Sequence, residues 1–136
     1  MARIEPEEES FDPETFSPAD AAHAFQEGVR LFNAAEYHAA HEEIEKCWLA
    51  TQGPDSDFYK GLIQAAICLH HFRRDNHDGA RKLYSGHRKL LGPYLPEHHG
   101  IDLAAFLAEM QRVLGPVMRK QEVRFEHATR PVLAVE

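Results

Sequence analysis

Residues 57–74 read "DFYKGLIQAAICLHHFRR", and this is the most apolar segment of the chain. When it is wound as a helix, its apolar side chains cover well over half of the circumference, which is typical of a helix buried on several sides. The side chains on this arc are Tyr59, Leu62, Ile63, Ala66, Ile67, Leu69 and His70. We therefore predict a central helix around which the rest of the chain packs.

Apolar residues at helical spacing, with signals for helix ends, predict four more helices around the central one. They are expected over residues 17–34, 36–50, 77–91 and 102–116. Ser17 and Asp102 are the expected N-caps of the first and last, and Asp55 or Ser56 that of the central helix. No stretch has the alternation of a strand. The predicted fold class is all-α, a compact bundle of about five helices whose short loops favour antiparallel neighbours.

The length of 136 residues predicts a single domain. Residues 1–16 are acidic and are expected to form a mobile N-terminal tail, and residues 17–116 the single helical domain. Residues 117–136 are expected to be a C-terminal extension, helical to about residue 127 and then frayed. Two segments about 40 residues apart also align, bringing Ala40 onto Ala80, which predicts two tetratricopeptide-like helical hairpins.

Composition narrows the classes of function. The formal net charge of −7 argues against nucleic acid and anionic membrane surfaces as partners. No apolar run approaches the roughly 20 residues that span a bilayer, and the acidic N-terminus has no signal-peptide core. Cys47 and Cys68 form no C-x-x-C pair, which fits a reduced, cytoplasmic protein. The chain also has no glycine-rich phosphate loop, no G-x-S-x-G and no Glu-x-x-His pair.

Residues 41–48, "HEEIEKCW", carry the main candidate site. His41 and Glu45 are four residues apart, so their side chains share one helix face, and Trp48 and Tyr37 lie on the same face. Burying a histidine and a carboxylate on an apolar face costs free energy unless they are paired or bind something. One helix can give two ligands to a divalent ion at this spacing, as in H-E-x-x-H metalloproteases.

The central helix can supply the missing ligand, because Gln64 and His71 share a stripe that an antiparallel hairpin with the second helix would bring close. We predict that His41, Glu45 and His71 are metal ligands, for which zinc, manganese or iron would be suitable. Gln64 would orient a bound water or substrate, and Glu42 is the candidate base. Trp48 and Tyr37 would line the pocket.

Three alternatives stay open for these residues. His41 and Glu45 can form a buried, purely structural pair, or can carry out acid–base chemistry without metal. Trp48 can be a core residue. His98 and His99, in a loop bounded by proline and glycine, can bind a metal adventitiously, but we interpret that loop as solvated. The basic fourth helix, with Arg81 and Arg88 on one face, can attract an anion or simply face solvent.

The pattern H-x-x-x-E-x-x-W, formed by His41, Glu45 and Trp48, is similar to that of the domain of unknown function 309 family. The resemblance runs from about Phe25 to Leu114 and includes "GLIQ" and the elements Asn76, Gly79 and Ala80. It implies an all-helical fold and metal binding by the motif, and it brings no established activity. Asp75 departs from the family pattern, in which glycine is common before the asparagine.

Two functional hypotheses follow. The first is a small cytoplasmic protein that binds a divalent metal and, if it is an enzyme, uses metal-assisted attack of water on a small-molecule substrate. The second is a non-catalytic helical module that binds a protein partner, with a structural His41–Glu45 pair. Whether the chain is an enzyme, and its oligomeric state, are open at this point.

Overall fold

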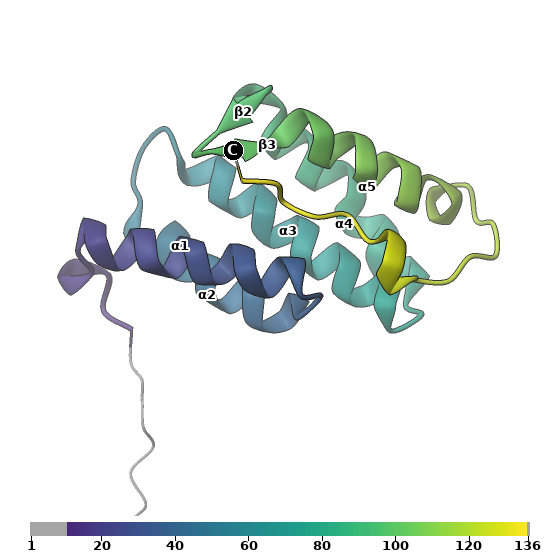
Figure 1. Cartoon of the computed structure of the whole chain (residues 1–136), viewed down its shortest axis with the longest axis horizontal. Helices are drawn as coiled ribbons and strands as arrows, with labels where there is room; N and C mark the ends of the chain where they lie inside the picture. Colours follow the sequence, from purple (N-terminus) through teal and green to yellow (C-terminus); the bar gives the residue numbers. More distant parts are fainter. Residues whose placement is uncertain (1–10, 136) are drawn as a thin grey trace, which may run out of the picture.

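Five α-helices account for most of residues 11–135, which the computed structural model describes (Figure 1). They are α1 (Pro18–Asn33), α2 (Tyr37–Ala50), α3 (Ser56–Arg73), α4 (His77–Leu91) and α5 (Leu103–Met118). The smaller elements are the 3₁₀ helices η1 (Pro13–Thr15), η2 (Gly92–Tyr94) and η3 (His127–Thr129) and the strands β2 (Glu97–His98) and β3 (Ile101–Asp102). The predicted all-α bundle of about five helices is confirmed. Residues 1–10 of the expected tail lie outside the described part.

Side-chain caps begin three of the helices. At α1 the Ser17 hydroxyl accepts a hydrogen bond from the backbone N–H of Asp20, and the Asp20 carboxylate accepts one from the N–H of Ser17. Asn76 and Asp102 cap α4 and α5 with one bond each, in which the side-chain oxygen accepts from the N–H of Gly79 and of Ala105 respectively. These bonds satisfy N–H groups that have no partner inside the helix. The expected caps Ser17 and Asp102 are confirmed.

Two helical hairpins, α1–α2 and α3–α4, are joined by turns of the same geometry. Ala35 and Asp75 occupy the left-handed region, with φ of 65° and 61°. In each turn the following N–H bonds back into the preceding helix, from Glu36 to Leu31 O at 2.9 Å and from Asn76 to His71 O at 2.8 Å. The repeat of about 40 residues is therefore present in the backbone. Aspartate tolerates the left-handed conformation better than most residues, which explains how Asp75 stands where glycine is common.

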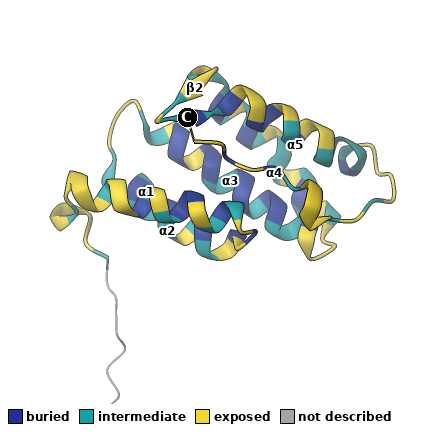
Figure 2. Cartoon of the chain, in the orientation of Figure 1, coloured by how far each residue is buried: buried dark blue, intermediate teal, exposed yellow. Residues whose placement is uncertain are grey.

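Helix α3 is the central helix, as predicted, and packs on both α2 and α4 (Figure 2). Its fully buried side chains include Phe58, Leu62, Cys68, Leu69 and Phe72. The expected arc is slightly misplaced, because His70 is only half-buried. The His70 ring lies 5.7 Å from the His38 ring, at the edge between α3 and α2.

The chain after α5 differs from expectation. Helix α5 passes through Pro116 and ends at Met118, and residues 119–126 form no helix. The chain then continues in extended form between α1 and α5 (Figure 1). Leu133 is fully buried, and the Asn33 side chain both donates to its carbonyl oxygen at 2.9 Å and accepts from its N–H at 2.7 Å. The expectation of a frayed end is wrong for this segment, because one buried leucine and a side-chain clamp hold it.

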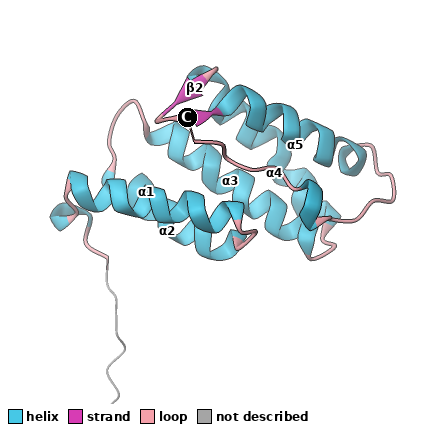
Figure 3. Cartoon of the chain, in the orientation of Figure 1, coloured by secondary structure: helices cyan, strands magenta, loops and turns pink. Residues whose placement is uncertain are grey.

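A short β-hairpin precedes α5, although no strand is expected there (Figure 3). Glu97 pairs with Asp102 and His98 with Ile101, in antiparallel register. Ile101 also forms an isolated bridge with Val135. The strands are two residues long and leave too little sequence to show a period of two. Within the described residues no helix is long and apolar enough to cross a membrane.

We expect Leu133→Ala to lower the free energy of unfolding by about 2–4 kcal/mol, because it leaves a cavity at a fully buried site. Urea unfolding followed by circular dichroism measures this change. Val132→Ala is the matched control, since Val132 is 40% exposed and its truncation is expected to cost less than about 1 kcal/mol. Equal, small effects of both variants would contradict the packed position of this segment.

His87 makes the fold sensitive to acid. It is fully buried, and neither ring nitrogen has a hydrogen-bond partner among the described residues. Burial, with a smaller contribution from the charge of Arg88, lowers the pKa of His87 from 6.5 to about 4. Between about pH 6.5 and pH 4, His87 therefore binds a proton in the unfolded chain but stays neutral in the folded chain. The contribution of neutral His87 to the free energy of unfolding is fully present above pH 6.5 and is lost as the pH falls toward about 4.

Between pH 7 and pH 4.5 we expect the free energy of unfolding to fall less in His87→Leu than in the wild type. The difference should be roughly 2–3 kcal/mol. Urea unfolding at several pH values measures it. His127→Leu, at an exposed position, is the control and should leave the pH profile of the wild type unchanged. Parallel profiles for wild type and His87→Leu would show that His87 is not the acid-sensitive group.

Candidate functional site

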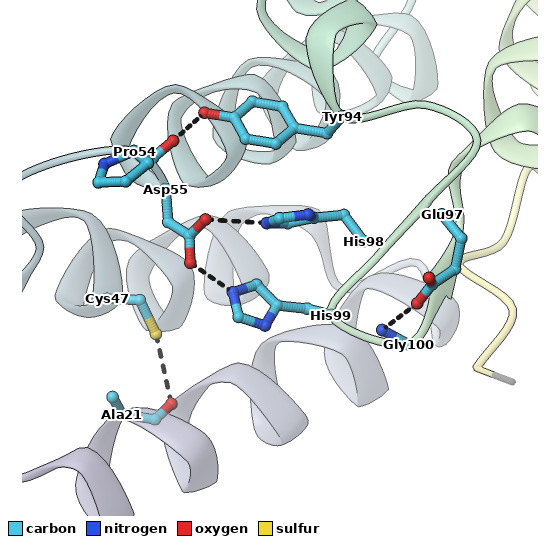
Figure 4. Close-up of polar contacts among 9 residues, drawn as sticks. All are labelled: Ala21, Cys47, Pro54, Asp55, Tyr94, Glu97, His98, His99 and Gly100. Carbon is cyan, nitrogen blue, oxygen red and sulfur yellow. Dashed lines mark hydrogen bonds and ion pairs between the residues drawn. The ribbon is translucent and has the colours of Figure 1, made fainter.

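Asp55, His98 and His99 meet at one end of the bundle (Figure 4). Asp55 directly precedes α3, and the two histidines lie in the β2–β3 hairpin. The Nε2 atom of His98 is 2.8 Å from one Asp55 carboxylate oxygen, and the Nε2 atom of His99 is 2.7 Å from the other. An ionised carboxylate only accepts hydrogen bonds, so both imidazoles donate Nε2–H. One carboxylate therefore holds both histidines.

The hairpin backbone turns the two neighbouring histidines toward the same carboxylate. His99 and Gly100 both have positive φ, 49° and 75°. The Glu97 carboxylate accepts a hydrogen bond from the N–H of Gly100 at 2.8 Å and so closes the turn. In a regular strand, adjacent side chains would point to opposite faces, so the left-handed turn at His99 is what permits convergence.

The loop before α3 has a second contact, with the 3₁₀ helix η2 that precedes the hairpin. The Tyr94 hydroxyl donates a hydrogen bond to the carbonyl oxygen of Pro54, next to Asp55 (Figure 4). Asp55 was an expected N-cap, but its side chain makes no capping bond to α3, because both carboxylate oxygens bond the histidines. Asp55, a residue type that often caps helices, thus makes a tertiary contact with His98 and His99 instead.

The electrostatics of the group favour an ionised Asp55. Partial burial raises the pKa of Asp55, but the hydrogen bonds and charges of His98 and His99 outweigh it, and the pKa lies below its usual value. The carboxylate is therefore negatively charged at neutral pH and lies between the two imidazole rings. That charge is what a cation would encounter at this position.

Aromatic rings surround the histidines and fix their orientation. The ring of buried Phe58 lies 4.7 Å from His98 and 5.3 Å from His99, and Tyr94 lies 4.7 Å from His98. Tyr59 stacks on His99, with an angle of 17° between the ring planes. The side chains of His98 and Asp55 are about one-third exposed, so the group is open to solvent on one side.

The donor set suits a transition-metal ion. One ligand atom from each of Asp55, His98 and His99 lies within 4.8 Å of the other two, and no other group of this kind occurs within residues 11–135. Two imidazoles and one carboxylate are a ligand set for iron(II), manganese and zinc. A cation would take the place of the two Nε2 protons, so its binding would compete with protons.

The residues predicted from "HEEIEKCW" lie elsewhere and do not converge. The Nδ1 atom of His41 donates to the carbonyl oxygen of His38 on its own helix, at 2.7 Å. The His71 ring accepts a hydrogen bond from the Asn76 side chain, at 3.0 Å, in the turn before α4. Glu45 lies in a surface cleft beside Phe16. His41, Glu45 and His71 form no group of mutually close ligand atoms in the described chain.

The reason is the direction of one stripe of α3. Gln64 and His71 face α4, where glycines leave room for them. A Cβ atom at Gly86 would lie 2.3 Å from Oε1 of Gln64, and one at Gly79 would lie 2.7 Å from Cγ of His71. The histidine of α3 that lies near α2 is His70, so the predicted convergence of Gln64 and His71 with α2 does not occur.

The remaining predicted residues have separate surroundings. Glu42 is exposed and lies 3.4 Å from Nε2 of His38. Trp48 is half-buried against the core. Tyr37 is fully buried, its hydroxyl has no partner among the described residues, and burial raises the pKa of Tyr37 to about 12. Whether Glu42 or Gln64 has a catalytic role stays a prediction.

The interpretation of the His98–His99 loop as merely solvated is corrected by its contacts with Asp55. The sequence contains a signal for this group, a pair of adjacent histidines in a loop bounded by proline and glycine. Asp55 is 43 residues before His98, however, and nothing in their spacing connects the two. The link depends on the tertiary position of the hairpin.

The geometry defines a five-helix bundle with a candidate Asp/His/His metal site. Residues 25–83 match the family model described as "Domain of unknown function (DUF309)", so this part of the chain is a DUF309 domain, as the resemblance predicts. An "Uncharacterized protein" of Aquifex aeolicus (strain VF5) is 27% identical over 95 residues, which are 69% of this chain. The chain spans only 28% of that protein's length. Asp55 lies inside the matched family segment, and His98 and His99 lie beyond it.

We expect Asp55→Asn to destabilise the fold by about 1 kcal/mol, because an amide cannot accept from both imidazoles. Asp75→Asn is the control, since Asp75 is exposed and asparagine also tolerates its left-handed conformation. Urea unfolding measures the difference, and amide hydrogen exchange should be faster at Gly100 and Ile101 only in Asp55→Asn. Unchanged exchange in the hairpin would mean that Asp55 does not hold it.

Proposed function

We propose that the chain binds a divalent transition-metal ion through Asp55, His98 and His99. The observation that carries the proposal is the convergence of three ligand atoms of suitable type from two separate segments of the chain. Zinc, manganese and iron(II) are the candidate ions. The aromatic rings that orient the imidazoles support it, because ligands held in place lose little freedom on binding.

Asp55, on the one hand, and His98 and His99, on the other, would have different roles as metal ligands. Asp55 would supply the negative charge, while His98 and His99 would supply neutral nitrogen ligands through Nε2, with the single ring proton of each on Nδ1. Three protein ligands leave coordination positions open toward the exposed side of the group. A divalent ion bound there supplies Lewis-acid activation of water, so metal-dependent hydrolysis is the reaction class that we propose.

The set predicted from the sequence, His41, Glu45 and His71, is a separate proposal. The rings of His38, His41 and His70 do form a row, with centroid distances of 5.0 Å and 5.7 Å. Metal binding there would need movement of His71 away from Asn76. The alternative of a non-catalytic interaction module, with these histidines in structural roles, competes with both metal proposals.

Metal content in three forms of the full chain tests these proposals. We expect near-stoichiometric metal in untagged wild type and in His41→Ala/Glu45→Ala, and none in Asp55→Asn/His98→Gln. Elemental analysis measures the content, and added zinc, manganese or iron(II) should raise the melting temperature of the first two forms. At a metal concentration 100-fold above Kd the stabilisation would be about 2.7 kcal/mol.

Two results would overturn the proposal. Loss of metal in His41→Ala/Glu45→Ala alone would move the site to α2. Metal-free wild type that shows no thermal shift with any of the three ions would leave Asp55, His98 and His99 as a structural contact that holds the hairpin.

A further inference from the structure

An apolar pocket adjoins the Asp55/His98/His99 group, and we propose that it binds the apolar body of a small molecule whose metal-binding oxygen head reaches that group. This inference rests on the proposed metal site and names the class of ligand for it. The ligand would have an uncharged hydrocarbon body and one polar end.

The pocket has the size and lining of a small-molecule site. Its volume is about 510 Å³, within the range of roughly 300–1,000 Å³ that is common for such sites. The pocket is lined by Ala22, Phe25 and Val29 of α1, together with Tyr59 of α3 and Ile101 of β3. No Asp, Glu, Lys or Arg of the described chain lines it. Such a lining favours an uncharged body, because a charge would lose hydration without gaining a partner.

His99 belongs to both the pocket and the candidate metal site. Its ring stacks on Tyr59 and lies 5.9 Å from Phe25, while its Nε2 atom is 2.7 Å from the Asp55 carboxylate. One face of the imidazole is therefore part of the apolar wall, and one edge points to the other metal ligands. A molecule lying along this ring would bring its end to the site.

The charges of the site define the polar end. The Asp55 carboxylate lies 2.7 Å from Nε2 of His99, beside the pocket that His99 lines. An anionic head would be repelled by Asp55 unless a cation were bound there. With a divalent ion in place, an oxygen ligand such as a hydroxamate would be attracted instead. The head and body thus have separate requirements that can be tested separately.

Three probes separate the pocket from the metal. Octanohydroxamic acid has both an apolar body and a metal-binding head, acetohydroxamic acid has the head only, and octanamide has the body without a strong chelator. On the zinc-loaded full chain we expect octanohydroxamic acid to bind at least tenfold tighter than acetohydroxamic acid, measured by calorimetry. On metal-free protein, octanamide should shift the amide NMR signals of Phe25, Val29 and Ile101.

Ala22→Phe and Ala19→Phe provide a matched pair of variants. Both alanines are exposed on α1, but only Ala22 lines the pocket, so only Ala22→Phe is expected to fill it. We expect Ala22→Phe to abolish the tenfold advantage and the octanamide shifts, and Ala19→Phe to keep both. Zinc content should be the same in the two variants.

The outcomes distinguish this inference from the proposed function. Octanamide shifts in a protein that binds no metal would support the pocket and overturn the metal site. Zinc binding with equal affinity for the two hydroxamates, and no octanamide shifts, would support the metal site and overturn the pocket. An equal effect of Ala19→Phe and Ala22→Phe would show unspecific binding of the hydrocarbon chain and would also overturn it.

Discussion

Helix α3 is buried on several sides, and the other helices are arranged around it. A helix that is apolar around so much of its circumference must be covered from several directions, or it leaves hydrocarbon in water. The chain meets this need with α2 on one side and α4 on another, each entered through a left-handed turn. The hairpin geometry and the order of the helices follow from it. The extended segment that contains Leu133 adds a further cover between α1 and α5.

A contact between distant segments turns one end of this scaffold into a candidate site. Asp55 gives up the capping of α3 and instead holds His98 and His99, so the loop before α3 and the hairpin before α5 are joined. Helix capping by a side chain contributes about 1 kcal/mol, and two charge-assisted hydrogen bonds in a partly exposed position can offset that loss. The left-handed backbone at His99 is the other local cost. Both costs occur at the same place, where the donor set suits a metal ion.

The fold could be predicted from the sequence because its signals are local. Apolar residues at helical spacing and capping residues such as Ser17 and Asp102 placed the five helices to within a few residues. The path of the chain after Met118 could not be predicted in this way, since it depends on Asn33 meeting Leu133 a hundred residues later. The β2–β3 hairpin is likewise too short to leave a pattern.

The site was harder to predict, because the sequence does not show which neighbouring helix each side of α3 faces. The stripe of Gln64 and His71 was correctly identified on α3, but periodicity does not tell which neighbouring helix a stripe faces. Gly79 and Gly86 decide it, because they let Gln64 and His71 pack on α4. His71, the expected third ligand, therefore packs against Gly79 of α4. The same type of donor set, two histidines and a carboxylate, does occur, but on loops at the other end of α3.

The matched family segment and the candidate metal site only partly overlap in the sequence. The DUF309 segment, residues 25–83, runs from the middle of α1 to the middle of α4 and supplies Asp55, whereas both histidines come after it. A chain with the same segment and a different connection before α5 would keep the buried α3 and Asp55 but would lose both candidate histidine ligands. The matched segment therefore contains the central helix α3 and two residues that line the apolar pocket, Phe25 and Tyr59. The candidate metal site has to be argued from the hairpin of this chain, where His98 and His99 stand.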